Sequence, residues 1–185
     1  MHTLFTQPHA RRQILTLLFA LCPVFVCAHT AGAEPASMVT QTISLGRGEK
    51  TTITLSPEAL KAYPVQSPPD IAVKNRKGET QRVLKGYNGV KLIDLLDKAA
   101  LVSADPNDFK KTIVVATASD GYKAVFSWNE LYNTSVGAGV LVLYAKDGKP
   151  LSDDEGRIAL ISVNDTGTGP RHVRWLKDIQ VRTID

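Results

Sequence analysis

Near its C-terminus the chain reads Gly169-Pro170-Arg171-His172-Val173-Arg174-Trp175-Leu176-Lys177-Asp178-Ile179-Gln180-Val181. Within it, Arg171, His172, Arg174, Lys177 and a tryptophan share seven positions, directly after the Gly- and Thr-containing run 164–170. Backbone amides from such a loop, followed by a fork-shaped guanidinium, suit an anion or a planar heterocycle. The simpler interpretation is a basic surface turn that leads into an edge strand, because runs of charge are usually solvated.

The N-terminal residues 1–33 have the pattern of a signal peptide. Arg11 and Arg12 precede an apolar run over residues 14–26, and small residues follow, ending in Ala-Gly-Ala at 31–33. The apolar run is too short for a stable membrane span. We therefore expect cleavage before Glu34 and export to the periplasm.

Residues 34–185 are the predicted mature domain, long enough for one hydrophobic core. They keep 20 of the 22 Lys and Arg residues and all 18 Asp and Glu residues, so their charge balance does not favour nucleic acid. Both cysteines and three of the four histidines precede residue 34. The predicted domain has His172 as its one histidine and has no thiol, which excludes a disulfide, a Cys/His zinc site and a cysteine nucleophile there.

In the first half of this domain, β-branched residues alternate with polar ones. The alternation predicts two hairpins, formed by residues 39–45 with 51–55 and 71–74 with 81–84. Between the hairpins, Ser56-Pro57-Glu58 is typical of a helix start, and Pro64 of a stop shortly after.

The second half predicts one longer amphipathic helix and several strands. The expected segments are a helix over 91–101, paired strands over 112–117 and 122–126, one helical turn over 129–132, a fully buried strand over 140–145 and a strand over 157–163. Trp128 lies among apolar neighbours and is predicted to belong to the core. The total of about eight short strands and two or three short helices indicates one α+β domain dominated by mixed β-sheet.

Five segments give the chain a resemblance to the molybdopterin-binding domain of the sulfite oxidase superfamily. They are residues 55–64, 87–96, 119–122, 143–151 and 170–176, in the family's order. The last is the most specific, because Pro-Arg-His-Val-Arg-Trp-Leu resembles the family's Ala-Arg-His/Ser-Val-Lys-Trp-Leu. The resemblance covers most of residues 34–185 and implies a single sulfite oxidase-fold domain.

The chain departs from that family at the metal ligand. The family's enzymes carry a molybdenum-binding cysteine ahead of the helix that corresponds to residues 89–96, whereas residues 75–82 here read Asn-Arg-Lys-Gly-Glu-Thr-Gln-Arg. A soft thiolate fixes and tunes that metal, so we expect no metal here. Its absence opposes redox turnover without deciding whether any redox activity remains, while a pocket for the organic pterin can remain. This combination resembles exported bacterial proteins that bind a reduced pterin and report it to a membrane-bound enzyme of cyclic di-GMP metabolism.

A pterin needs a carboxylate for its 2-amino and N3–H edge, and Asp120 and Asp165 are the candidates. Arg171 or the amides of 166–169, starting at Thr166, are the candidate donors to O4 and N5. The simpler role for Asp120 is to form a turn by bonding its own backbone.

The flat face of a pterin needs an aromatic ring or a guanidinium, and the candidates are Trp175, Tyr87 and Tyr122. Core packing is the simpler role for Trp175. The resemblance implies that Arg171 and Arg174 match cations that hold the molybdopterin phosphate, and that His172 is a neighbour of the site. The predicted ligand-binding residues are thus Tyr87, Asp120, Tyr122, Asp165, Thr166, Arg171, His172, Arg174 and Trp175.

Two other functions stay open at this point. One is a molybdopterin-dependent oxidoreductase or its cofactor-binding subunit, which the Arg171 to Leu176 match favours and the absence of a cysteine after Glu34 opposes. The other is an interaction scaffold without a small ligand, because a fold alone does not determine function. In the sensor hypothesis, loops 134–139 and 164–170 are the segments expected to respond to the ligand.

Overall fold

The computed structural model describes residues 2, 38–48, 50–101 and 105–184. The predicted signal peptide and its cleavage site before Glu34 fall outside these residues, except for His2. Residues 38–184 form an α+β domain in which β-sheet dominates, as the sequence predicts. Within the described residues, no helix has both the length and the apolar character that a membrane crossing requires.

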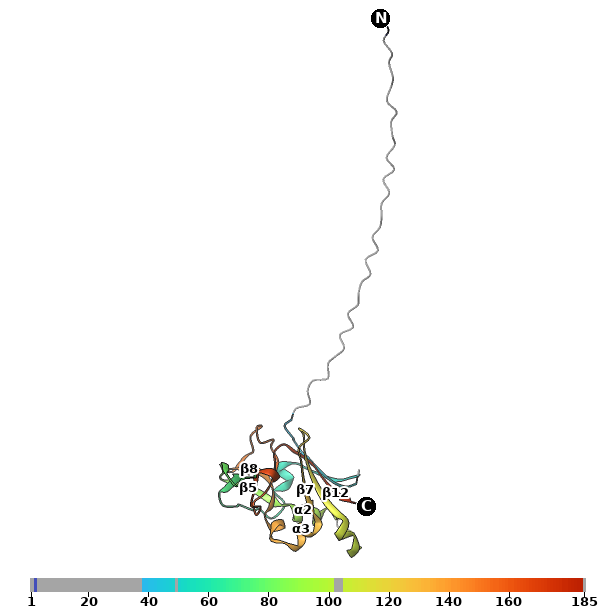
Figure 1. Ribbon diagram of the computed structural model, residues 1–185, viewed down its shortest axis with the longest axis vertical. Helices are drawn as coiled ribbons and strands as arrows, with labels where there is room; N and C mark the ends of the chain where they lie inside the picture. Colours follow the sequence, from blue (N-terminus) through green and yellow to red (C-terminus); the bar gives the residue numbers. More distant parts are fainter. Residues whose placement is uncertain (1, 3–37, 49, 102–104, 185) are drawn as a thin grey trace. The chain divides into compact units, whose positions relative to one another are not determined.

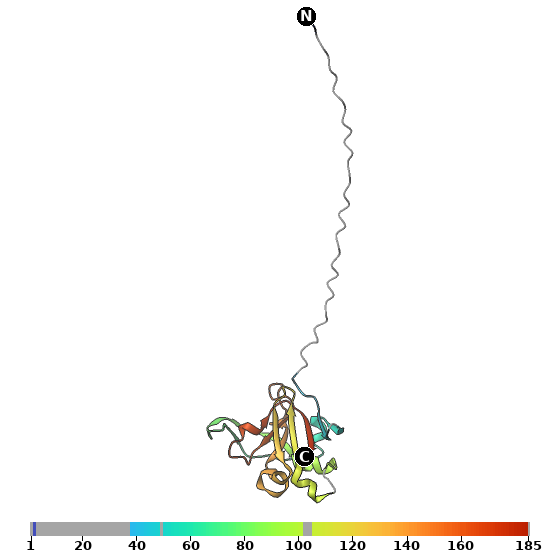
Figure 2. The same ribbon diagram turned by 45° about the vertical axis from the view of Figure 1, so that its right-hand side comes forward.

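The first sheet is mixed and runs in the order β2-β1-β12-β6-β7. Its strands are β1 (Ile43–Arg47), β2 (Lys50–Leu55), β6 (Thr112–Ala118), β7 (Lys123–Ser127) and β12 (Leu176–Thr183). β1 and β12 are parallel and the other pairs are antiparallel. Figure 2 shows the yellow strands β6 and β7 beside the red β12.

The basic segment therefore does not lead into an edge strand. β12 pairs with β1 on one side and β6 on the other, so it lies in the middle of the first sheet. Its residues Leu176, Ile179 and Val181 are fully buried. Burial of these apolar residues places the strand inside the sheet although basic residues precede it. The interpretation as an edge strand is wrong.

The second sheet runs in the order β11-β10-β8-β5, with β9 added to β8. Its strands are β5 (Tyr87–Lys91), β8 (Val140–Lys146), β9 (Lys149–Pro150), β10 (Ala159–Ser162) and β11 (His172–Val173). β8 is buried at every position but its last, which confirms the prediction of a strand covered on both faces. Val142 faces the main core between the two sheets, and Leu143 faces a second core under a hairpin.

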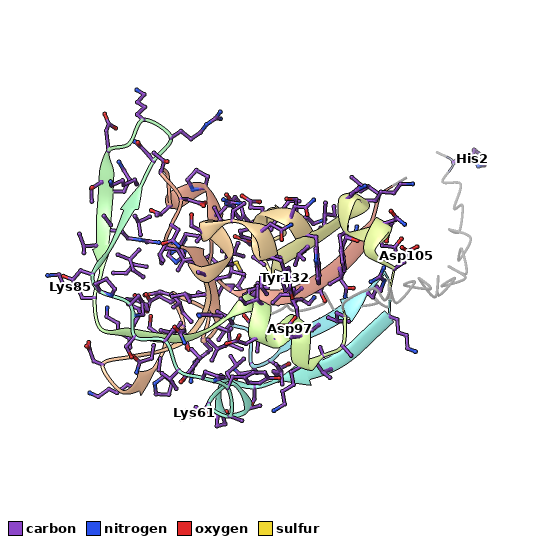
Figure 3. The ribbon with its side chains drawn as sticks, turned by 90° about the horizontal axis from the view of Figure 1, so that it is seen from below. His2, Lys61, Lys85, Asp97, Asp105 and Tyr132 are labelled. Carbon is purple, nitrogen blue, oxygen red and sulfur yellow. The ribbon has the colours of Figure 1, made fainter. Side chains whose placement is uncertain are left out.

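That hairpin consists of β3 (Ile71–Lys74) and β4 (Thr80–Leu84), which the sequence predicted within a residue. Ile71, Val73 and Leu84 pack on the outer face of the second sheet. The remaining hairpin residues extend beyond the body of the domain, as the pale green ribbon above Lys85 shows (Figure 3).

The helices are short and lie at the rim of the sheets. They are α1 (Pro57–Leu60), α2 (Leu92–Lys98), α3 (Trp128–Asn133), α4 (Ser135–Ala138) and the 3-10 segments η1 (Pro106–Lys111) and η2 (Gly169–Arg171). Ser56 caps α1 by accepting a hydrogen bond from the backbone N–H of Ala59, as predicted. Figure 1 shows α2 and α3 near one end of the sheets.

The helix predicted over 91–101 is shorter in the structure. Residues 87–91 form strand β5, and the helix begins only at Leu92, because Val90 is needed in the second sheet opposite Val142. Trp128 is buried and stacks between Phe109 and Tyr132, which confirms its predicted place in the core.

Candidate functional site

The basic segment crosses from one sheet to the other. β11 ends at Val173 in the second sheet and β12 begins at Leu176 in the first, so Arg174 and Trp175 form the link between them. A cavity of about 240 Å³ lies beside this link, lined by Asp120, Tyr122, Gly169, His172, Arg174 and Trp175. It brings together five of the nine residues predicted to bind the ligand.

Trp175 has a left-handed backbone with φ of +50°, an uncommon conformation for a residue with a large side chain. Three hydrogen bonds fix it. The backbone N–H of Trp175 donates to the carbonyl of Glu155 over 3.2 Å, its carbonyl accepts from the N–H of Ser119 over 2.9 Å, and its indole Nε1 donates to the carbonyl of Asp153 over 2.8 Å.

Gly156 makes this conformation of Trp175 possible. A Cβ at position 156 would lie 2.3 Å from the Cα of Trp175, and the glycine itself has φ of +87°. Only glycine avoids both the collision and the backbone penalty. The tryptophan is therefore held at the cavity by backbone contacts, and the expectation that it packs as an ordinary core residue beside Leu176 is not met, because it is partly exposed.

Arg174 supplies the charge of this cavity. Its guanidinium carbon lies 4.3 Å from the centre of the Trp175 ring. Among the described residues, Arg174 forms no ion pair with a carboxylate. A planar cation on an aromatic ring presents a flat, positively charged surface to the cavity.

The turn between β6 and β7 provides the opposite wall. Asp120 Oδ1 accepts a hydrogen bond from the backbone N–H of Tyr122 over 2.9 Å, so the turn-forming role considered for Asp120 is present. The hydroxyl of Tyr122 donates to the carbonyl of Pro170 over 2.7 Å. No hydrogen bond from the described residues uses Asp120 Oδ2, so that oxygen remains as an acceptor at the cavity.

His172 is a neutral member of the cavity wall. Its Nδ1 lies 2.9 Å from Nη2 of Arg82, and because a guanidinium only donates, Nδ1 accepts and the ring proton is on Nε2. Burial is the largest cause that lowers the pKa of His172, and together with the positive charges of Arg82 and Arg174 it brings that pKa to about 4. The imidazole thus stays uncharged at neutral pH and offers one N–H donor.

Arg82 is a residue of this neighbourhood that sequence reasoning missed. It lies on β4, at the end of the segment 75–82 that stands where the resembling enzymes carry their cysteine. Like Arg174, it has no ion-pair partner within the described part of the chain. The contact between Arg82 and His172 could not be found from sequence, because only the fold brings these two positions together.

Glu155 lies near both arginines. Burial raises the pKa of its carboxyl group, while the positive charge of Arg82, a hydrogen bond from the Ser152 backbone and the charge of Arg174 act in the other direction. The hydroxyl of Tyr87 donates to Glu155. Tyr87 itself is buried in the second sheet and lies outside the cavity, where it supports Glu155.

Arg171 and Asp165 are engaged with each other. Arg171 Nε donates to Asp165 Oδ2 and Nη2 to Oδ1, both over 2.5 Å, and Nη1 donates to Glu130 Oε1 over 2.8 Å. The guanidinium also lies 4.6 Å from the ring centre of Phe126. Burial opposes its charge, but the bonds with Asp165 and Glu130 outweigh burial and raise the pKa of Arg171.

This network removes both residues from the set available to a ligand at the cavity. Asp165 also accepts from the Ser162 hydroxyl over 2.7 Å, so both of its oxygens are engaged. Thr166 is exposed in the loop and does not line the cavity. The structure therefore separates Tyr87, Asp165, Thr166 and Arg171 from the five residues that line the cavity.

The described part of the domain has other hollows, and two of them are comparable in size. One of about 300 Å³ lies between β3 and residues 163–168, and one of about 370 Å³ lies beside residues 39–44. Neither combines an aromatic ring with an unpaired guanidinium. Within the described residues, no group of three His, Cys, Asp or Glu side chains is arranged to hold a metal ion.

No family model matches this chain, and no curated protein matches it in sequence. Its fold is similar to the solved structure of the sulfane dehydrogenase SoxCD from Paracoccus pantotrophus, with a TM-score of 0.51 and 16% sequence identity over 82% of this chain. The chain spans 40% of the SoxCD chain. At this identity the likeness shows a distantly shared fold, in a domain of the α+β class.

Proposed function

We propose that this chain is a non-catalytic sensor that binds a reduced pterin in the cavity beside Arg174 and Trp175. The observation that carries the proposal is the convergence there of one carboxylate, one guanidinium stacked on an indole, and one neutral imidazole. The volume of about 240 Å³ lies just below the range of roughly 300–1,000 Å³ that is typical for drug-sized ligands. A bicyclic heterocycle with a short side chain suits such a space.

Each edge of a pterin has a complementary group at this cavity. Asp120 Oδ2 accepts from the 2-amino group and N3–H, and the Nε2–H of His172 is the donor for O4 or N5. The Trp175 ring with the guanidinium of Arg174 provides the flat contact. Asp120 takes the role for which Asp165 was the other candidate, because Asp165 is engaged with Arg171.

The side chains at this cavity support binding rather than turnover. His172 has a pKa of about 4, which is far from the range in which an imidazole exchanges protons efficiently at neutral pH. Residues 34–185 contain no cysteine, so the thiolate that holds molybdenum in the enzymes of the resembling family is missing from them. The donor set fits the organic ring and does not fit that metal, and we assign no redox step to the site.

The compartment and the partner are part of the same proposal. The signal-peptide pattern of residues 1–33 supports export, and a pterin sensor in the periplasm would report to the outer part of a membrane-bound enzyme of cyclic di-GMP metabolism. The ligand acts by favouring one conformation of the cavity wall, because it shifts an equilibrium only through its different affinity for two states.

An oxidoreductase is the second candidate function, and the fold similarity to a sulfane dehydrogenase favours it. Metal analysis separates the two, using protein from a host that synthesises the molybdenum cofactor. Stoichiometric molybdenum in the purified protein would establish the oxidoreductase and refute the sensor.

The sensor is tested by the thermal unfolding midpoint with tetrahydropterin, dihydropterin, molybdopterin or no ligand. A ligand that binds only the native state stabilises it by about 2.7 kcal/mol at a hundredfold excess over Kd. We expect a rise with the simple reduced pterins. A rise with molybdopterin alone would support the oxidoreductase, and no rise with any of the three would leave the ligand-free scaffold.

The variant Asp120→Asn tests, in the same unfolding assay, whether the pterin binds at this cavity. Asparagine keeps the acceptor for the Tyr122 N–H and replaces Oδ2 with a donor, which faces the donor edge of the pterin. We expect an unchanged midpoint without ligand and no rise with it. Asp147→Asn, at an exposed turn away from the cavity, is the matched control and should respond as the wild type does.

A further inference from the structure

The β3–β4 hairpin has one closed and one open edge. On the β3 side, the Thr168 hydroxyl accepts from the N–H of Lys74 over 2.9 Å and donates to the carbonyl of Ala72 over 2.7 Å. Backbone groups of Ala72 and Lys74 thus face away from β4. The residues that alternate with them, Ile71 and Val73, face β4 and form the hydrogen bonds between the two strands. Val83, which is opposite Ala72, consequently turns its own N–H and C=O to the outer side of β4.

No strand covers that outer side within the described part of the chain. Residues 80–83 are exposed, and 46% of the Val83 surface is accessible. The register shift at Gln81 leaves 82–84 as the regular part of this edge. Exposed edges are usually blocked, and an open one can add a strand from another chain.

Charge gathers on the same hairpin. Lys74, Arg76, Lys77 and Arg82 oppose a single acid, Glu79, which gives residues 71–84 a net charge of +3. Residues 34–185 have a net charge of +2, so the rest of that segment is slightly negative. None of the four cations forms an ion pair with another described residue.

These features select the kind of partner. A second copy of the chain paired along β4 would bring like charges together, which costs energy. An extended acidic segment would complete the backbone bonds at Val83 and neutralise the cations. A lipid surface would use the charge but not the backbone groups of the edge.

We propose that the outer edge of β4 is the docking site for an extended, acidic segment of a partner protein, and that this site is linked to the cavity. The link rests on the proposed ligand function. Arg82 of β4 donates to His172 in the cavity wall, and Gly169 of the same wall packs so closely on β3 that an added Cβ would lie 2.6 Å from the carbonyl oxygen of Lys74. A ligand that displaces His172 or Gly169 therefore also displaces the docking edge.

The test uses the protein as the cell makes it from the full chain, including any processing of the leader. The probe is a short peptide of alternating threonine and glutamate, with the threonine–lysine peptide as its charge control. We expect the acidic peptide alone to bind, with amide chemical-shift changes centred on Val83. Changes centred elsewhere, or equal binding of the basic peptide, would overturn the proposal.

Val83→Pro removes the outward N–H without removing a ladder bond, and Val83→Thr keeps that N–H. We expect at least a tenfold loss of peptide affinity for the proline variant only, provided its unfolding midpoint matches that of the threonine variant. Arg76→Glu with Lys77→Glu is the second variant, and should weaken binding whether or not the proline variant folds. Unchanged affinity in this double variant would contradict the proposal.

Two further outcomes separate the surface from the ligand function. Peptide binding without any pterin response in the unfolding assay would refute the pterin sensor and retain the docking edge, whereas a pterin response without peptide binding would refute the edge alone. If the protein shows both responses, tetrahydropterin should change its affinity for the acidic peptide. An affinity that is the same with and without tetrahydropterin would refute the link between the cavity and the docking edge. Binding to phosphatidylglycerol vesicles without peptide binding would assign the hairpin to a membrane surface and overturn the proposal.

Discussion

Arg171 and Arg174 lie three positions apart in one basic segment, and the structure gives them opposite surroundings. Arg171 donates hydrogen bonds to Asp165 and Glu130 and lies on Phe126, so carboxylates of the domain itself neutralise its charge. Arg174 lies on Trp175 at an open cavity and has no carboxylate partner among the described residues. One cation stabilises the fold, and the other remains available to a ligand.

The difference comes from which element each arginine faces. Arg171 ends η2 and faces α3, where Glu130 also forms the capping box with Ser127. Arg174 lies beyond β11, where the chain changes sheets and the opposing turn at Asp120 leaves a space. A cation with two acidic neighbours is neutralised within the fold, whereas one placed beside a cavity keeps its charge unpaired.

The largest expected effect is at Arg171. Arg171→Ala leaves Asp165 and Glu130 without their cation. Breaking a buried pair in this way typically costs about 3–5 kcal/mol, and this part-buried network belongs at the lower end of that range. We expect a loss of that order in the free energy of unfolding, measured with denaturant. Glu130→Gln removes one bond only and should cost less. A loss below that of Glu130→Gln would show that the network does not hold the domain together.

Gly156→Ala is expected to cost about 2–4 kcal/mol, because it adds a collision with the Trp175 backbone to the penalty of a positive φ. Gly148→Ala is the matched control, since it has φ of +73° and open space around it, and it should cost only about 1 kcal/mol. Unfolding midpoints of the two variants measure the difference. Equal costs would mean that position 156 does not restrain Trp175.

Local sequence signals predicted the elements and not the site. Hairpins, the Ser56 cap and the buried strand β8 follow from alternation and turn residues, which act over a few positions. Strand β5 was missed because its apolar residues continue the helical spacing of α2. The place of β12 in the centre of its sheet depends on pairing with distant strands.

The site could be predicted only in part for the same reason. The cavity residues on the basic segment and its opposing turn were expected, since each has a distinctive chemistry. Sequence does not tell which arginine meets Asp165, and it gives no sign that Arg82 reaches His172 across the fold. Contacts between residues far apart in sequence decide those roles.

His172 should make the stability of the domain depend on pH. Its folded pKa of about 4 is below the ordinary value of 6.5, so its contribution is complete above pH 6.5 and is lost as the pH falls toward 4. After allowance for solvent screening, the loss is on the order of 2 kcal/mol. Denaturant unfolding of the wild type and of His172→Asn, whose side-chain oxygen can still accept from Arg82, measures this difference.

The raised pKa of Glu155 acts in the opposite direction, because the folded state then binds a proton more readily than the unfolded chain. Glu155 is present in the wild type and in His172→Asn, so the difference between their pH dependences of unfolding reports His172 alone. Identical pH dependence in wild type and His172→Asn would contradict an uncharged imidazole between Arg82 and Arg174.

The smallest expected change in stability is at Arg174. That small change distinguishes an arginine available to a ligand from a structural one such as Arg171. Arg174→Gln breaks no ion pair and loses the cation contact with the Trp175 ring, so the free energy of unfolding should change by less than about 1 kcal/mol. Its positive charge lowers the pKa of His172, and a histidine NMR titration should show that pKa rising in the variant. The midpoint rise with reduced pterin should be lost at the same time. If Arg174→Gln instead destabilises the domain as much as Arg171→Ala does, both arginines are structural and the cavity loses the cation on which its proposed function depends.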